Sequence, residues 1–128
     1  MNRGRLITIE GIDGAGKTTL AAALLDAFKA RGLDARLLRE PGGVAAAERI
    51  RGLVIDPGLH VTARTEALLY AAARAQLVEE ALEPLLSAGS WVLLDRFIDS
   101  SLAYQGGGRE LGIDAVRAIN EFAIRTAW

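Results

Sequence analysis

The residues with the clearest chemical meaning form a glycine-rich segment near the start of the chain. Residues 11–18 read Gly-Ile-Asp-Gly-Ala-Gly-Lys-Thr, matching G-x-x-x-x-G-K-[ST], and an apolar run at residues 6–9 precedes them. Glycines in this arrangement let backbone N–H groups surround an anion, and the helix that follows directs its positive end to the same place. Lys17 would contact the β and γ phosphates, and the Thr18 hydroxyl would bind Mg²⁺. The alternative is a glycine-rich turn with a solvated lysine.

This pattern predicts a phosphate-binding loop that takes ATP with Mg²⁺. The residues that we expect to bind the nucleotide are Gly11, Ile12, Asp13, Gly14, Ala15, Gly16, Lys17, Thr18 and Thr19.

A second chemical pair, Asp95-Arg96, directly follows the apolar run Val92-Leu93-Leu94. A carboxylate at the end of a buried strand is how a Walker B aspartate reaches Mg²⁺ and the phosphates. The neighbouring guanidinium can hold a phosphate with its planar fork. An ion pair at the surface is the alternative. Because a phosphate-binding loop lies upstream, we predict that Asp95 binds metal and that Lys17, Asp95 and Arg96 are catalytic.

Other residues indicate a second substrate. Asp13 lies within a loop predicted to hold anions, so its carboxylate would rather accept a hydrogen bond from a sugar hydroxyl, or else face water. Tyr70 and Arg74 are one helical turn apart, which suits stacking on a base and donating to its carbonyl. A packed aromatic beside a snorkelling arginine is the ordinary alternative. Arg51, Arg74 and Arg96 could together neutralise a phosphoryl acceptor. We interpret His60, the single histidine, as a loop residue.

Three apolar runs are expected to form the strands that position these residues: Leu6 to Ile9, Ala35 to Leu38 and Trp91 to Leu94. Helical patterns between them predict an α/β fold with a parallel sheet and helices on both faces. Polar residues follow each strand. Since ligands bind at the carboxyl ends of parallel strands, these three edges predict one shared cleft.

The expected helices follow from apolar spacing and from capping residues. The first should run from about Gly16 to Arg31, end at Gly32, and bury Leu20, Leu24 and Phe28. The second should begin after Thr62, be bent or broken at Pro84, and end at Gly89. The third should open at Asp114 and place Ala115, Ile119, Phe122 and Ala123 on one face.

Composition narrows the class of protein. A length of 128 residues with 51% hydrophobic content suits a single globular domain, and the absence of cysteine excludes disulfides and thiolate metal sites. A net charge of −1 gives no general field for nucleic acid. No run resembles a signal peptide or a membrane span, so we expect a cytoplasmic protein with neither nucleic acid nor membrane as a partner.

Four segments together resemble bacterial thymidylate kinases of the P-loop nucleoside monophosphate kinase family. These are the phosphate-binding loop, residues 39–43 (REPGG), residues 68–76 (LLYAAARAQ) and residues 95–106 (DRFIDSSLAYQG). The resemblance implies transfer of a phosphoryl group from ATP to thymidine monophosphate, giving the diphosphate for dTTP synthesis. It also implies Mg²⁺ as a cofactor and a homodimer.

The resemblance further assigns the acceptor pocket. Asp13 would meet the 3′-hydroxyl, Tyr70 would stack on thymine, and Arg74 would contact the base. Arg51 and Arg96 would hold the acceptor phosphate. The remaining implied pocket residues are Ser101 at the base edge, Tyr104 under the deoxyribose, and Gln105.

Similar proteins continue beyond the last predicted helix with a further strand, an arginine-rich lid, and a final strand and helix. We therefore expect residues 1–128 to be the N-terminal part of one P-loop kinase domain, truncated at the C-terminus, and to lack appreciable activity alone. Three other functions stay open: a different nucleoside monophosphate kinase, a P-loop switch ATPase, and a fragment that binds nucleotide or dimerises without catalysis.

Overall fold

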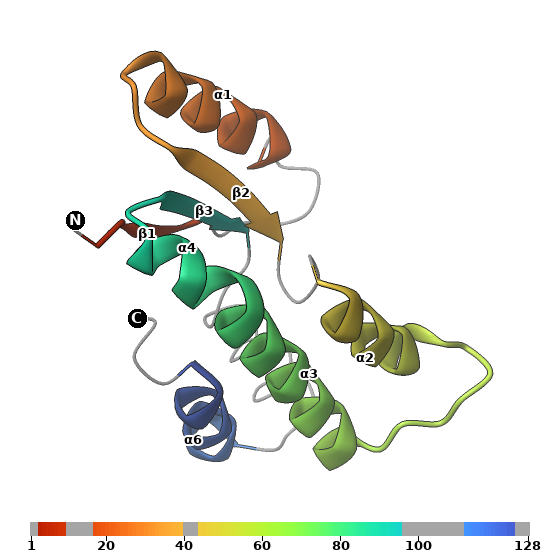
Figure 1. Cartoon of the computed structure of the whole chain (residues 1–128). Coiled ribbons are helices and arrows are strands. Elements are labelled where there is room, and N and C mark those ends of the chain that lie inside the picture. The colour runs from red at the N-terminus through yellow and green to blue at the C-terminus, as the bar shows by residue number, and fades with distance from the viewer. Residues whose placement is uncertain (1–2, 10–16, 40–43, 96–111, 125–128) are drawn as a thin grey trace.

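Three parallel strands and the helices around them make up the fold in the computed structural model, which describes residues 3–9, 17–39, 44–95 and 112–124 (Figure 1). The strands are β1 (Leu6–Ile9), β2 (Ala35–Arg39) and β3 (Trp91–Asp95). The helices are α1 (Lys17–Ala30), α2 (Ala45–Ile55), α3 (Ala63–Leu77), the π-helical turn η1 (Val78–Leu82), α4 (Glu83–Ser87) and α6 (Ile113–Ile124). None of the helices in these ranges combines the length and the apolar character needed to cross a membrane.

The sheet has the order β1-β3-β2, and both pairs of neighbouring strands are parallel. The three predicted strands are confirmed, although β2 and β3 each extend one residue further, to Arg39 and Asp95. Strand β3 is therefore central and hydrogen-bonded on both sides. This explains why its side chains from Val92 to Asp95 are buried.

Helices cover both faces of the sheet, as predicted (Figure 1). Successive side chains of a strand point to opposite faces, so β3 contributes to two cores. Val92 and Leu94 pack with Leu82 and Leu86 of the η1–α4 segment, while Leu93 packs on the α1 side. One continuous apolar strand thus holds the two helical layers together.

The predicted first helix is confirmed as α1, but Leu20, which we expected to be buried, is exposed. Leu20 is 52% exposed, and the neighbouring Ala21 is buried. The helix meets the sheet through Ala21, Leu24, Leu25 and Phe28, which have i, i+3, i+4, i+7 spacing. Since each residue turns a helix by about 100°, Leu20 is rotated away from that stripe. Gly32 follows the helix with a φ of 80°, as expected of its C-terminal stop.

The long second helix is not broken at Pro84, but it contains a π-helical turn just before this residue. Helix α3 begins after its N-cap Thr62, as predicted, and continues through η1 into α4 (Figure 1). In the π-helical turn, the N–H of Glu83 donates to the carbonyl of Val78, five residues earlier. Pro84 is the second residue of α4, which follows this turn, and it has no N–H to offer to the preceding turn. Widening the helix there accommodates the proline, and Gly89 ends the segment with a φ of 91°.

Helix α2 was not predicted from the sequence. Its alanines and the acidic Glu48 in its first turn favour a helix, and the Asp56-Pro57-Gly58 segment follows its last residue. The N–H of Gly58 donates to the Asp56 side chain at 2.8 Å, which closes a turn toward α3. The exposed loop beyond contains His60, in agreement with its interpretation as a loop residue.

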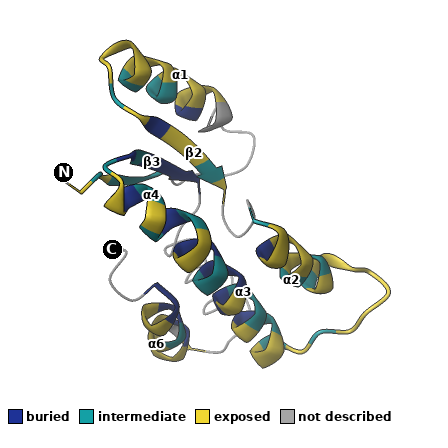
Figure 2. Ribbon diagram, viewed as in Figure 1, coloured by how far each residue is buried: buried dark blue, intermediate teal, exposed yellow. Residues whose placement is uncertain are grey.

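The structure buries only part of the apolar face predicted for α6: Ala123 is buried and Ile119 is half-buried. Phe122 is 75% exposed and Ala115 is also exposed. The residues that the structure buries are Val116, Asn120, Ala123 and Ile124. Figure 2 shows α6 with its exposed residues turned away from α3. A polar side chain, Asn120, lies at the centre of the buried stripe, so a search for apolar spacing selected a different face.

Candidate active site

The carboxyl ends of the three strands form one aligned edge. Asp95 pairs in register with Ile9 of β1 on one side and with Arg39 of β2 on the other. The Nε of Arg39 lies 4.0 Å from Oδ2 of Asp95, whose side chain is 13% exposed. These two residues line a cavity of about 190 Å³ together with Ala21, Leu37 and Leu38. The prediction that the strand ends converge is confirmed for the parts of the edge that the structure describes.

The phosphate-binding loop is framed by the elements that its pattern requires. Strand β1 ends at Ile9, beside Asp95, and helix α1 begins at Lys17. The backbone of Lys17 and Thr18 forms the first turn of α1, and Thr19 is exposed. The loop residues 11–16 and the side chains of Lys17 and Thr18 lie outside the described part of the chain. The predicted strand and helix therefore flank the loop, while its contacts stay predictions.

Asp95 suits a magnesium ion that is bound mainly through nucleotide phosphates. Within the described ranges, no group of three or more acidic, histidine or cysteine side chains could hold a metal on its own. Mg²⁺ in phosphoryl-transfer sites typically takes one or two carboxylates, several waters and phosphate oxygens. A single, nearly buried carboxylate at the end of the central strand fits that donor set.

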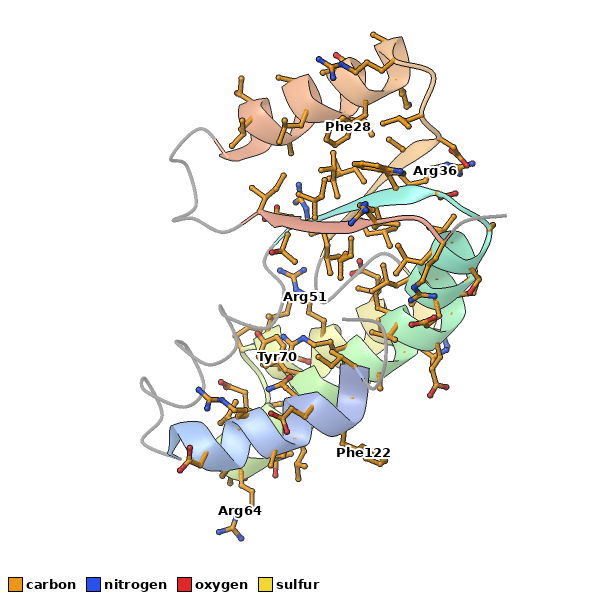
Figure 3. The ribbon with its side chains drawn as sticks, turned by 90° about the vertical axis from the view of Figure 1, so that its left-hand side faces the viewer. Phe28, Arg36, Arg51, Arg64, Tyr70 and Phe122 are labelled. Atoms are coloured by element: carbon orange, nitrogen blue, oxygen red, sulfur yellow. The ribbon has the colours of Figure 1, made fainter. Side chains whose placement is uncertain are left out.

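The described residues predicted for the acceptor pocket lie on α2 and α3. Arg51 is an exposed residue of α2, whereas Tyr70 is half-buried on α3. In the view of Figure 3, both lie between the carboxyl edge of the sheet and α6. Arg74, one turn after Tyr70, is only 2% exposed. The other predicted pocket residues lie outside the described residues: Asp13, Arg96, Ser101, Tyr104 and Gln105.

Arg74 makes a buried contact that sequence reasoning did not anticipate. Its Nη1 donates a hydrogen bond to Oδ1 of Asn120 on α6. Asn120 is 1% exposed, and its own amide donates to the Val116 carbonyl at 2.8 Å. The signal available in the sequence was an asparagine within an otherwise apolar helical stripe. Arg39 was noted as part of a polar strand end but was not placed in the site.

Asp34, whose pKa is shifted, lies at the opposite end of the sheet. The hydroxyl of Ser90 donates to Asp34 at 2.7 Å, and Arg36 donates to the other carboxylate oxygen at 3.1 Å. These hydrogen bonds, with Ser90 the larger cause, lower the pKa of Asp34 below its ordinary value. The residue stands before β2, away from the phosphate-binding loop, so it belongs to the supporting structure.

Comparison with known proteins identifies the family. A family model described as thymidylate kinase matches residues 9–127. A thymidylate kinase of Geobacillus sp. (strain WCH70) is 53% identical over 95% of this chain, and one of Halothermothrix orenii is 50% identical over 98%. A thymidylate kinase of Chromobacterium violaceum is 47% identical over 98%. The chain spans 59% to 61% of the length of these three relatives.

Proposed function

The chain belongs to the thymidylate kinase family, and from that membership we propose that it is part of an enzyme that transfers the γ-phosphoryl group of ATP to thymidine monophosphate. The products are ADP and thymidine diphosphate. The observation that carries the proposal is the match over residues 9–127, which includes both the phosphate-binding pattern and the Asp95-Arg96 pair. The arrangement of β1, β3 and α1 around one sheet edge supports it.

Phosphoryl transfer requires the protein to position the donor and acceptor phosphates and to offset their negative charges. In-line phosphoryl transfer needs no covalent intermediate on the enzyme. Lys17 and the backbone of the loop would hold the donor phosphates, and Arg51 and Arg96 would hold the acceptor phosphate. Mg²⁺, bound by Asp95 and Thr18, would offset the negative charge of the donor phosphates. Arg39 adds a positive charge beside Asp95 on the same edge.

Specificity for the acceptor is assigned to α3 and to residues 101–105. Tyr70 would stack on the base, and Arg74 would donate to a base carbonyl. Asp13 would accept from the 3′-hydroxyl of the sugar, Ser101 would face the base edge, and Tyr104 with Gln105 would line the sugar pocket. A switch ATPase has no need of such a second pocket, which favours a kinase over that alternative.

The test is a coupled assay of ADP release with a panel of nucleoside monophosphates, run on the protein as it is naturally expressed. Thymidine monophosphate should be the preferred acceptor, and omission of any acceptor should leave little ATP hydrolysis. A preference for another base would assign the protein to a sibling kinase. Acceptor-independent hydrolysis would favour a switch ATPase instead.

We also propose a homodimer and a cytoplasmic location. The location follows from the substrates, because ATP and nucleoside monophosphates are cytoplasmic metabolites. Helices α2 and α6 both pack on α3, and each of the three exposes a large apolar side chain: Leu53 on α2, Leu68 on α3 and Phe122 on α6. Such surfaces favour association. Analytical ultracentrifugation should find a dimer that Phe122→Ser weakens, and a monomer at every concentration would contradict the proposal.

A further inference from the structure

Arg39, the last residue of β2, lies on the edge of the sheet where we propose that the nucleotide binds. It pairs in register with Asp95 of the central strand, and Asp95 pairs on its other side with Ile9. Ile9 comes two positions before the phosphate-binding pattern of residues 11–18. The guanidinium of Arg39 therefore starts from the same edge as the loop that is expected to hold the donor phosphates.

The contact between Arg39 and Asp95 is too loose to be a structural link between the two strands. The Nε of Arg39 lies 4.0 Å from Oδ2 of Asp95, beyond hydrogen-bond range, and the Arg39 side chain is 70% exposed. By comparison, Arg36 on the same strand donates to Asp34 at 3.1 Å. Ion pairs that water can reach add little to stability. Attraction of opposite charges thus places Arg39 beside Asp95 without fixing it there.

Asp95 needs positive charge nearby, whether or not a metal is bound. Its side chain is only 13% exposed, and a carboxylate taken out of water is costly unless charges or donors compensate it. In the proposed site, Mg²⁺ would lie at this carboxylate. Two positive charges about 4 Å apart repel each other, by an amount that grows as water is excluded. Arg39 and Mg²⁺ are therefore alternative partners of Asp95.

Phosphate oxygens are the acceptors best suited to a guanidinium that the metal displaces. The planar fork of arginine matches phosphate with two parallel N–H···O bonds, and such charge-assisted bonds are strong. Arg39 and Asp95 line the cavity of about 190 Å³ together with Ala21, which lies one turn after Lys17 on α1. Reaching a phosphate in this cavity requires only that an exposed side chain rotates, while β2 stays in place.

We propose that the guanidinium of Arg39 exchanges between two partners: Asp95 in the protein without metal, and the phosphates of the donor nucleotide once Mg²⁺ occupies Asp95. This inference rests on the proposed function. Without metal, Arg39 offsets the charge of the nearly buried carboxylate. When the metal enters with the nucleotide, it takes over that task, and the released guanidinium donates to phosphate oxygens. Arg39 thereby couples metal binding to nucleotide binding.

The experiment measures two affinities in the naturally expressed protein and in Arg39→Gln. The affinity for Mn²⁺ alone is measured by electron paramagnetic resonance, counting only the binding that Asp95→Asn abolishes. The affinity for the Mg²⁺ complex of a non-hydrolysable ATP analogue is measured by calorimetry. Arg39→Gln should bind Mn²⁺ at least about fivefold more tightly, because a competing charge about 4 Å away is removed. It should bind the nucleotide complex at least about tenfold less tightly, because charge-assisted hydrogen bonds are lost.

Arg36→Gln is the matched control, since Arg36 is another exposed arginine of β2 and pairs with Asp34 at the amino end of the strand. It should change neither affinity. Arg39→Lys keeps the positive charge and loses the planar fork. Its Mn²⁺ affinity should stay near that of the unmodified protein, while the nucleotide complex binds less tightly. Changes in Arg36→Gln equal to those in Arg39→Gln would reveal a general effect of surface charge and overturn the proposal.

The opposite signs of the two expected changes decide the matter. If Arg39→Gln bound both ligands less tightly, the role of the arginine would be structural only. Tighter Mn²⁺ binding alone would make Arg39 a fixed counter-ion, and weaker nucleotide binding alone would make it a plain phosphate ligand. Each of these results, like the absence of any Mn²⁺ binding that depends on Asp95, overturns the exchange and leaves the kinase assignment intact. Failure of the unmodified protein to bind the nucleotide complex would instead remove the proposed function, and this inference with it.

Discussion

At the amino end of the sheet, where β2 and β3 begin, Asp34 accepts hydrogen bonds from Ser90 and Arg36, whereas at the carboxyl end Asp95 faces Arg39 across 4.0 Å. The Asp34 carbonyl also accepts from the Trp91 N–H at 2.7 Å, which ties the starts of the two strands together. The carboxyl end borders the cavity of about 190 Å³. A hollow of about 590 Å³ also lies at the amino end, where Asp34 and Arg36 line it.

The two ends of the sheet thus have different roles: the amino end stabilises the fold, and the carboxyl end forms the candidate site. Polar groups at the amino end are satisfied by other parts of the protein at short distances, so they hold the strands in register. Side chains at the carboxyl end line the cavity where we propose that the nucleotide and its metal bind. Parallel sheets bind ligands at this end because the loops that follow the strands meet there.

The largest expected effect is a difference in turnover between two variants, in which an aspartate at one end of the sheet is replaced by asparagine. Asp95→Asn removes a charge that the proposed metal site needs, so turnover should fall by more than about a hundredfold, or about 3 kcal/mol of activation free energy. Asp34→Asn is the matched control, and it should leave turnover unchanged. Steady-state kinetics on the naturally expressed protein checks both. Equal turnover in Asp95→Asn and Asp34→Asn would erase the proposed distinction between the ends.

A smaller effect, on stability alone, is expected at Gly4. A Cβ at this position would overlap the Ser90 carbonyl oxygen, and the Gly4 N–H donates to the Leu86 carbonyl at 2.8 Å. Because that oxygen belongs to the backbone, Gly4→Ala should destabilise the fold by about 1–3 kcal/mol. Gly52→Ala is the control, since its Cβ would meet open space within α2. It should stabilise by about 0.5–1 kcal/mol. Denaturant unfolding that ranks the two variants in the opposite order would refute this account of the amino end.

The smallest effect concerns the acid dependence of stability. The Ser90 hydroxyl is the main cause of the lowered pKa of Asp34. A lowered carboxyl pKa stabilises the fold above the ordinary value of about 3.9, and this contribution is lost as the pH falls through the lowered pKa. Ser90→Ala should raise the pKa of Asp34 toward its ordinary value. The difference in unfolding free energy between the parent and Ser90→Ala should then narrow in acid. A difference that stays constant from neutral to acidic pH would show that Asp34 is not involved.

Much of the fold was predictable because its signals are local. The predicted strands at residues 6–9 and 91–94 are short apolar runs, Thr62 marks the start of a helix, and Gly32 and Gly89 mark the ends of helices. Helix α2 was not predicted, and its packing on α3 stabilises it. Leu20 was assigned to a buried face because it is large and apolar, but the rotation of α1 exposes it.

The sequence by itself determined the family and led to the chemistry that we propose, since the loop pattern of residues 11–18 and the Asp95-Arg96 pair are contiguous and specific. Only the tertiary structure decided that β3 lies between β1 and β2, which sets Asp95 beside both Ile9 and Arg39. It also decided that Asn120 meets Arg74 across 46 positions. The physical reason is that a motif depends on neighbours along the chain. A buried hydrogen bond depends on which face each helix turns inward, and that choice is settled by packing of the whole core.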